Sequence, residues 1–257
     1  MATKQPAGNG EIQIIQVNTG TITVAVVGTT PLILNRLSEK AKRELLLPAP
    51  KKTAADKASK LKHDPLEEFR ASPVTLRDEA EPTLLAMPAT AFKGAMRTAA
   101  LDLPGAKKSQ IGRLTYIGAE YVGIYGVPKV YSTIVRSADM NRTPDVRTRC
   151  IVPRWAAVMS ITFVKPIMRE QAIANLLAAA GITVGVGDFR PEKGAGNYGQ
   201  FEVVGMDDQR LLEIMKTGGR AAQVEAMADP ESYDDETDEL LAWFNVEVRR
   251  RGFKVAA

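Results

Sequence analysis

The chain has 257 residues, of which 45% are hydrophobic, and a formal net charge of +4. This hydrophobic content can build a sizeable core, in one large domain or in a domain with insertions. One histidine and one cysteine are too few for a zinc site, a His-based triad or an intrachain disulfide. The sequence has neither a long apolar run nor the apolar core of a signal peptide, so we expect no membrane association, no export and a cytoplasmic location.

Basic side chains gather in two segments of the chain. Residues 36–62 and 128–154 each carry a clear excess of lysine and arginine, whereas acidic residues gather in 64–81 and 229–239. Such segregation favours a polyanionic partner. A solvated lysine-rich loop explains residues 51–62 nearly as well.

A strand and a helix are predicted early in the chain. Residues 21–28 alternate apolar and polar side chains with the period of a half-buried strand. Residues 90–101 place apolar side chains at helical spacing, and the other face of this helix carries Lys93 and Arg97 one turn apart. Gly94 costs about 1 kcal/mol relative to alanine in such a helix, which predicts a close approach of another backbone there.

The segment between this strand and this helix is predicted to be an insertion. Proline and lysine content rises over residues 48–81, which favours irregular structure with one short helix over 65–70. His63 opens an acidic turn in this segment, and we expect it to be a solvated loop residue.

The middle of the chain is rich in strand signals. Residues 120–125 and 155–164 read as core strands, and residues 130–135 and 146–152 between them predict a long basic hairpin. Cys150 lies in the second arm of this hairpin, where we expect a small buried hydrophobe rather than a nucleophile.

A glycine-rich stretch follows a helix predicted over 169–180 and ended by Gly181. The apolar runs 182–186 and 201–204 predict two strands, joined by a turn that holds several glycines together with Phe189, Arg190, Lys193 and Tyr198. This pattern predicts a glycine-rich β-hairpin with a basic, aromatic tip. Such loops let a phosphodiester approach the main chain closely, although a long turn without a ligand is the alternative.

Two helices are predicted at the end of the chain, around 207–216 and 234–250. The second begins with acidic residues and ends with arginines, which is the order that its dipole prefers. Its apolar side chains must bury against something, and they are Leu240, Trp243, Phe244 and Val248.

The core elements follow one another as β-α-β-β-α-β. The predicted fold class is therefore α+β, with a ferredoxin-like or RRM-like core, a long inserted β-hairpin and a C-terminal helical extension. The expected domain organisation is an N-terminal arm at 1–19, a core at 20–205 with insertions at 38–82 and 128–152, and the helical extension at 206–257.

Three features occur together in this order. Residues 87–97 read Met-Pro-Ala-Thr-Ala-Phe-Lys-Gly-Ala-Met-Arg, residues 187–199 read Gly-Asp-Phe-Arg-Pro-Glu-Lys-Gly-Ala-Gly-Asn-Tyr-Gly, and a hairpin lies between core strands. In these features the chain, roughly over residues 20–205, resembles the RAMP (repeat-associated mysterious protein) superfamily. The likeness is greatest to the backbone subunits of CRISPR effector complexes and to related phage-encoded proteins.

The resemblance implies an RRM-like core that holds a single strand of RNA along a basic groove. It also implies that the inserted hairpin acts as a thumb and that protomers stack into a filament. Two features depart from the pattern: the RNP1 aromatic residues of true RRM domains are missing, and the acidic C-terminal helix has no counterpart.

These observations predict a non-catalytic protein, without cofactor or metal, that binds single-stranded DNA or RNA as a homo-oligomer or filament. The residues expected to contact the nucleic acid are Arg36, Lys93, Arg97, Arg136, Arg142, Arg147, Arg149, Arg190, Lys193, Gly194, Gly196 and Tyr198. Phe189 and Tyr121 offer further stacking faces, although core packing explains each aromatic residue as well.

Two alternative functions remain open at this point. One is a metal-dependent endoribonuclease, because some RAMP proteins cut RNA, with Asp139 as the one suitably displayed acid on the hairpin. A single carboxylate gives little support to metal catalysis. The other is a structural or assembly protein whose hairpin grips a neighbouring protomer.

Overall fold

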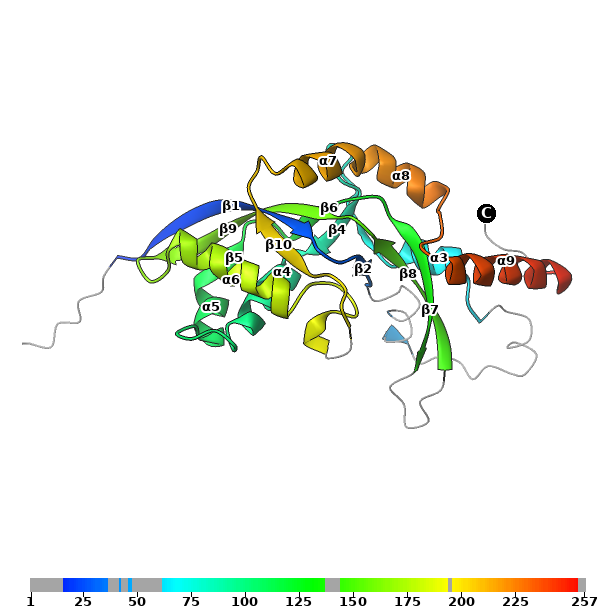
Figure 1. Ribbon diagram of the computed structural model, residues 1–257, viewed down its shortest axis with the longest axis horizontal. Helices are drawn as coiled ribbons and strands as arrows, with labels where there is room; N and C mark the ends of the chain where they lie inside the picture. The colour runs from blue at the N-terminus through cyan, green and yellow to red at the C-terminus, as the bar shows by residue number, and fades with distance from the viewer. Residues whose placement is uncertain are drawn as a thin grey trace, which may run out of the picture.

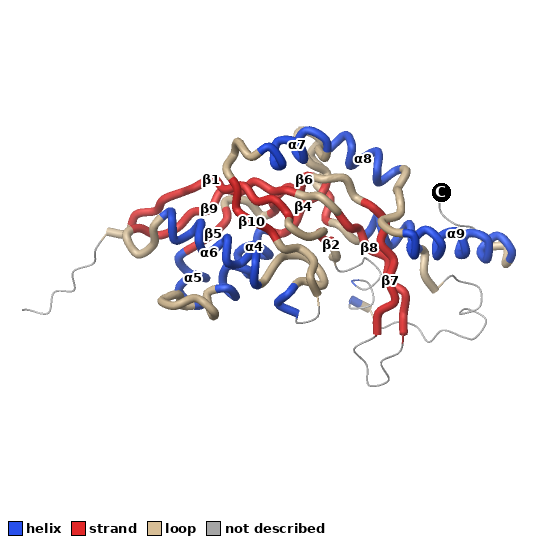
Figure 2. The backbone as a smooth tube through the Cα atoms, viewed as in Figure 1, coloured by secondary structure: helices blue, strands red, loops and turns tan. Residues whose placement is uncertain are grey.

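The computed structural model describes residues 16–36, 42, 46–47, 62–136, 144–193 and 196–253. Within these ranges the chain is a mixed α+β protein, as the sequence predicts (Figure 1, Figure 2). Arg142, Gly194 and Asp139 lie outside the described residues.

The strands and helices follow the chain in an order close to the predicted one. The strands are β1 (Asn18–Gly28), β2 (Leu32–Leu34), β3 (Val74–Thr75), β4 (Leu85–Pro88), β5 (Thr115–Ile117), β6 (Tyr121–Tyr125), β7 (Lys129–Arg136), β8 (Pro144–Val152), β9 (Ala156–Lys165) and β10 (Phe201–Val204). The helices are α3 (Pro65–Ala71), α4 (Ala89–Ala99), α5 (Lys108–Leu114), α6 (Glu170–Thr183), the short 3-10 helix η1 (Pro191–Lys193), α7 (Gln209–Thr217), α8 (Arg220–Ala228) and α9 (Asp235–Arg250).

The larger sheet is antiparallel and has the strand order β10-β1-β9-β6-β4-β3, with β5 also paired to β9. Its centre is the long ladder between β1 and β9, which runs from Asn18 opposite Lys165 to Val27 opposite Ala156. The predicted strands 21–28, 120–125 and 155–164 are confirmed as β1, β6 and β9. α5 and α8 were not predicted.

Both faces of this sheet are used, because successive side chains of a strand point to opposite faces. Val24 and Val26 of β1 face the main core, which α4 and α6 complete with Phe92 and Leu177. Ala25 and Val27 belong to a second cluster, where α7 contributes Leu211 and Ile214. The helices α4 and α6 therefore cover one face, and α7 covers part of the other (Figure 1).

The predicted hairpin is confirmed as β7 and β8, which pair from Lys129 opposite Ile151 to Arg136 opposite Pro144. Together with β2 they form a separate sheet of order β2-β8-β7. Beside β2, the segment around α3 continues along the edge of β8: the backbone N–H groups of Thr148 and Cys150 donate to Glu68 Oε2 (3.3 Å) and Ser72 Oγ (2.7 Å).

The other edge of the hairpin is covered by the start of the C-terminal helix. The backbone N–H of Val130 donates to the Glu231 carbonyl (2.8 Å), and that of Ser132 donates to Thr237 Oγ1 (3.2 Å). Uncovered strand edges are templates for pairing with other chains, so contacts on both sides protect the base of this hairpin.

The predicted glycine-rich β-hairpin is wrong. Residues 182–186 do not form a strand, because α6 continues to Thr183 and is followed by a loop up to β10. The helix ends at Thr183 with Val184 as its C-cap, and Gly185 after it has φ +70°, the left-handed conformation that favours glycine in this position. Gly181, the predicted terminator, lies inside the helix, where a Cβ atom would overlap the carbonyl oxygen of Phe201.

The predictions for Gly94 and for α9 are corrected as well. A Cβ atom at Gly94 would meet nothing within 4 Å, so no other backbone of the described chain closely approaches this position of the helix. In α9, Val248 is buried, but Trp243 is 59% exposed. The first turn of this helix lies beside β7, and part of its apolar face is uncovered (Figure 1). None of the described helices is long and apolar enough to cross a membrane.

The two helical glycines give opposite expectations on substitution. Gly181→Ala should lower the free energy of unfolding by roughly 1–3 kcal/mol, because α6 must move away from β10 to admit the methyl group. Gly94→Ala should raise it by about 0.5–1 kcal/mol, because the space is open and alanine restricts the unfolded chain. Chemical denaturation measures both. Equal effects at the two positions would contradict the helix–strand contact.

Candidate nucleic-acid interface

The predicted contact residues of the described chain lie mainly on three neighbouring elements: α4, the loop 184–200 and the β7–β8 hairpin. Thr98 Oγ1 of α4 donates to Glu192 Oε1 of the loop (3.3 Å). On the other side of the loop, the rings of Tyr198 and Tyr131 of β7 are 6.2 Å apart between centroids. The loop therefore lies between the helix and the hairpin.

Backbone contacts hold this loop along β2. The N–H of Asp188 donates to the Ile33 carbonyl (3.0 Å), and that of Gly199 donates to the Pro31 carbonyl (2.8 Å). Phe189 has φ +52°, a conformation that is uncommon for a residue with a side chain. Gly196 is buried, and a Cβ atom there would overlap the backbone of Phe189. A glycine at this position therefore allows the two parts of the loop to pack against each other.

A cluster of tyrosines joins the loop to the hairpin. Tyr198 is half-buried, and its hydrogen bond with Tyr131, together with burial, raises its pKa above the ordinary tyrosine value. Tyr131 also meets Tyr233 edge to face, with ring centroids 5.7 Å apart. Tyr198 is thus part of an internal contact, whereas Phe189 and Tyr121 are 40% and 37% exposed.

Several of the predicted arginines are engaged within the protein. Arg190 donates from Nη1 to the Gly187 carbonyl and from Nε to Glu192 Oε2, both at 2.9 Å. Arg36 donates from Nε to the Ala71 carbonyl (3.0 Å), which places it at the end of α3. These guanidinium groups stabilise the loop and the insertion.

The arginines of β8 face carboxylates. Arg147 Nη2 lies 2.9 Å from Asp145 Oδ2. Arg149 Nε lies 3.8 Å from Asp188 Oδ2, and burial lowers the pKa of Arg149 below its usual range although Asp188 opposes the shift. The positive charge predicted for this strand is therefore partly compensated inside the protein.

The remaining predicted cations form no ion pair with another described residue. They are Lys93, Arg97, Arg136 and Lys193. Lys93 and Arg97 lie one turn apart on α4, and Lys193 ends the η1 turn, directly after the Glu192 that contacts α4. Cations without an ion-pair partner in the described chain are thus found on α4 and on the adjacent loop, where the charge of Lys193 acts on Glu192, while Arg136 lies at the far end of β7.

The open face of the large sheet carries none of the predicted contact residues. Beyond α7 it shows hydroxyl groups, with Thr21 Oγ1 3.0 Å from Thr162 Oγ1 and Thr23 Oγ1 3.4 Å from Ser160 Oγ. Tyr116, 47% exposed, belongs to the same part of the sheet and was not predicted as a stacking residue. The predicted basic contact residues lie away from this surface.

The prediction that His63 is a solvated loop residue is wrong. Its Nδ1 lies 2.6 Å from Glu68 Oε1 and its Nε2 lies 2.9 Å from Asp145 Oδ1. The side chain is 20% exposed and joins the insertion to the hairpin. Asp145 is 82 positions away in sequence, so no local pattern around His63 predicts this contact.

Chemistry that needs a metal cluster or a reactive thiol finds no support among these residues. No group of three histidine, cysteine, aspartate or glutamate side chains able to hold a metal is found in the described part of the chain. Cys150 is completely buried, as predicted, and burial raises the pKa of its thiol well above the usual value.

No family model matches the sequence, and no curated protein matches it at a significant level. The charges, contacts and exposed rings described above are therefore the basis for a functional proposal.

The stability of the hairpin should depend on acid pH through Asp145. The hydrogen bond from Lys62, followed by those from His63 and the charge of Arg147, outweighs burial and lowers the pKa of Asp145 to about 2. Because the folded pKa lies below the unfolded value, this stabilisation is present above about pH 4 and is lost as the pH falls toward 2. Urea denaturation across this range should show a smaller pH dependence for Asp145→Asn than for the parent. An identical slope would contradict the assignment.

Proposed function

We propose that this protein is a non-catalytic binder of single-stranded nucleic acid, and that the surface of α4 beside the loop 184–200 receives the phosphodiester backbone. The observation that carries the proposal is the open space beside Gly94, which Lys93 and Arg97 flank. Both cations are without an ion-pair partner in the described chain. Glycine lets a ligand approach the main chain, and lysine and arginine neutralise phosphates.

The strand order supports a ferredoxin-like core for this surface. We number the four core strands along the chain, so that β1 is 1, β6 is 2, β9 is 3 and β10 is 4. In the sheet they lie side by side in the order β10-β1-β9-β6, which is 4-1-3-2. The helices α4 and α6 follow the first and third of these strands and pack on one face. This order of strands and helices supports a ferredoxin-like core and, with it, the resemblance to the RAMP superfamily.

The α4 surface and the loop also supply complementary kinds of contact. Lys193 adds a third cation on the loop, next to Glu192, and the exposed ring of Phe189 offers a face for base stacking. Stacking on a side chain requires an unpaired base, so this combination favours a single strand over a duplex. Arg149 and Arg190, already oriented by Asp188 and Glu192, would line the path toward the hairpin.

The hairpin suits a role between neighbouring protomers. Its strands extend away from the large sheet (Figure 1). The described contacts along their edges are with α3 and residues 231–237 near the base, and with Lys62 and His63 at Asp145. Proteins that bind single strands commonly become cooperative when neighbours touch. We therefore propose that copies of the chain assemble along the strand, with Arg136 near the end of β7 close to the next protomer or its ligand.

The charge assignment predicts a specific loss of affinity. Lys93→Ala with Arg97→Ala should weaken binding of labelled oligo-dT or oligo-U by roughly 1–3 kcal/mol, since two charge-assisted contacts are removed. The slope of log affinity against log salt should fall by about 0.7 for each phosphate that the protein no longer neutralises. Fluorescence anisotropy between about 50 and 300 mM salt measures both quantities.

The matched control is Lys216→Ala on α7, which removes an exposed positive charge on the opposite side of the sheet. Its affinity and salt slope should equal those of the parent. If Lys216→Ala lost as much affinity, the loss would be due to the lower net charge of the protein rather than to contacts on the α4 surface.

The protein should leave nucleic acid intact. Labelled RNA and DNA incubated with Mg²⁺ or Mn²⁺ should remain at full length, as expected of a binder without catalytic activity. Cleavage by the parent that is lost in Asp139→Ala would overturn the non-catalytic assignment and favour an endoribonuclease.

A further inference from the structure

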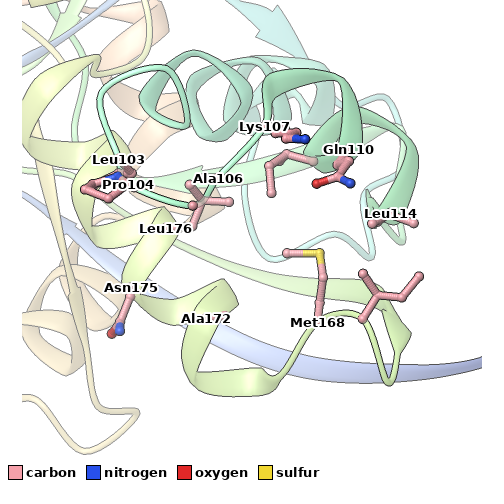
Figure 3. A pocket seen from close by; sticks show the side chains of 13 residues that line it. Leu103, Pro104, Ala106, Lys107, Gln110, Leu114, Met168, Ala172, Asn175 and Leu176 are labelled. Carbon is pink, nitrogen blue, oxygen red and sulfur yellow. The ribbon is translucent and has the colours of Figure 1, made fainter.

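Apolar surface is open to solvent in a groove between α5 and the start of α6 and on the outer face of α9. The groove has a volume of about 390 Å³, and Lys107 is the one charged side chain of its described lining (Figure 3). Its charge pattern therefore points to no particular partner. The helix α9 projects away from both sheets (Figure 1), and it carries charges of both signs in a fixed order along its length.

The fold turns one face of α9 toward the protein and the opposite face toward solvent. Thr237 and Val248 are buried, and Leu241 packs against the main core. The spacing of these three residues places them on one side of the helix. Trp243 and Val246 lie on the other side and are 59% and 65% exposed. The anchored helix thus leaves an indole ring and a branched aliphatic side chain uncovered.

The outer face of α9 is symmetrical in kind about Trp243. Leu240 lies three positions before Trp243, and Val246 lies three positions after it. Glu236 lies seven positions before Trp243, and Arg250 lies seven positions after it. Seven residues are about two helical turns, or roughly 10 Å along the axis, so these side chains follow one stripe. The stripe is acidic at its start, apolar in the middle and basic at its end.

Such a stripe complements a second copy of itself in the antiparallel orientation. When two helices cross with Trp243 against its equivalent, Leu240 of each copy faces Val246 of the other. Glu236 of each copy then faces Arg250 of the other. A parallel pair would instead place Glu236 against Glu236 and Arg250 against Arg250. Charges that flank an apolar seam select the orientation of paired helices, and here they select the antiparallel one.

We propose that two copies of the chain associate through the outer faces of α9, antiparallel and centred on Trp243. The contact is isologous, since the same surface of both copies takes part, and it closes a twofold dimer. An exposed tryptophan is the kind of anchor on which protein interfaces depend. One helix face is a small interface, so we expect a dissociation constant in the micromolar range. The inference does not require nucleic acid and is independent of the proposed function.

One like-charge contact in this arrangement is compensated within each copy. Glu239 would lie near Glu247 of the other copy. Glu247 accepts hydrogen bonds from Arg250 Nη2 and Arg251 Nε, both at 2.9 Å. A guanidinium group has five N–H donors, so Arg250 can keep this contact and also donate to Glu236 of the second copy.

A charge exchange tests the pairing by sedimentation velocity on the full chain without nucleic acid. Glu236→Arg alone and Arg250→Glu alone each place like charges together at both ends of the pair, so each should weaken dimerisation roughly tenfold. In an equimolar mixture of the two variants, opposite charges meet at both ends. The mixture should therefore associate about as well as the parent.

Two further variants separate the contact from general effects. Arg249→Glu makes the same change of charge one position earlier and about 100° away around the helix, so it should dimerise nearly as the parent does. Trp243→Ala should weaken dimerisation at least about tenfold, because it removes the central apolar contact. The ring is largely exposed in the single copy, so the thermal unfolding temperature of the dilute protein should stay unchanged.

Cysteine cross-linking tests the orientation. The only cysteine of the chain, Cys150, is completely buried, so introduced thiols report without background. Full-length Glu236→Cys mixed with full-length Arg250→Cys should give a covalent dimer on mild oxidation, whereas Glu236→Cys alone should give little.

Three results would overturn the proposal. They are a parent that stays monomeric well above micromolar concentration, a mixture of the charge variants that associates no better than either variant alone, and equal cross-linking of Glu236→Cys with itself and with Arg250→Cys. Failure of the parent to bind nucleic acid would contradict the proposed function and leave this dimer intact.

Discussion

The antiparallel ladder between β1 and β9 is the constraint on which the rest of the structure depends. It joins residues 18–27 to residues 156–165, and it fixes which side chains face α4 and α6 and which face α7. Because β9 leads directly into α6, the same ladder also places the end of α6, and with it the loop 184–200, against β2. The position of the candidate interface thus follows from pairing far from it in sequence.

Tertiary contacts decide which positive charges are available to a ligand. Arginines on the hairpin and the loop are paired or partly compensated by carboxylates such as Asp145, Asp188 and Glu192, which the fold brings beside them. Lys93 and Arg97, on a helix face turned from the core, have no such partner in the described chain. Charge counted along a sequence therefore overstates the basic surface. Among the predicted contact residues, the cations without an ion-pair partner in the described chain lie on α4, on the neighbouring loop and, for Arg136, at the far end of β7.

The α+β class, the central strands and the inserted hairpin could be predicted because their signals are local. The alternation in β1 and the apolar stripe of α4 each lie within one element. The role of Gly181 could not be predicted, because the same residue type ends helices and also admits a close helix–strand contact. The exposure of His63 and Trp243 could not be predicted. Whether each side chain is covered depends on elements that are distant in sequence.

The hairpin is held at its base from both edges, by Glu68 and Ser72 on one side and by the segment around Glu231 and Thr237 on the other. The C-terminal extension is thereby more than an appendage, since its first turn occupies hydrogen-bonding positions that a further strand would otherwise take. Removing this extension would expose the backbone hydrogen-bonding groups along the edge of β7. A chain shortened before Glu231 would then be prone to grow by edge-to-edge strand pairing, a route to aggregation that leaves the large sheet intact.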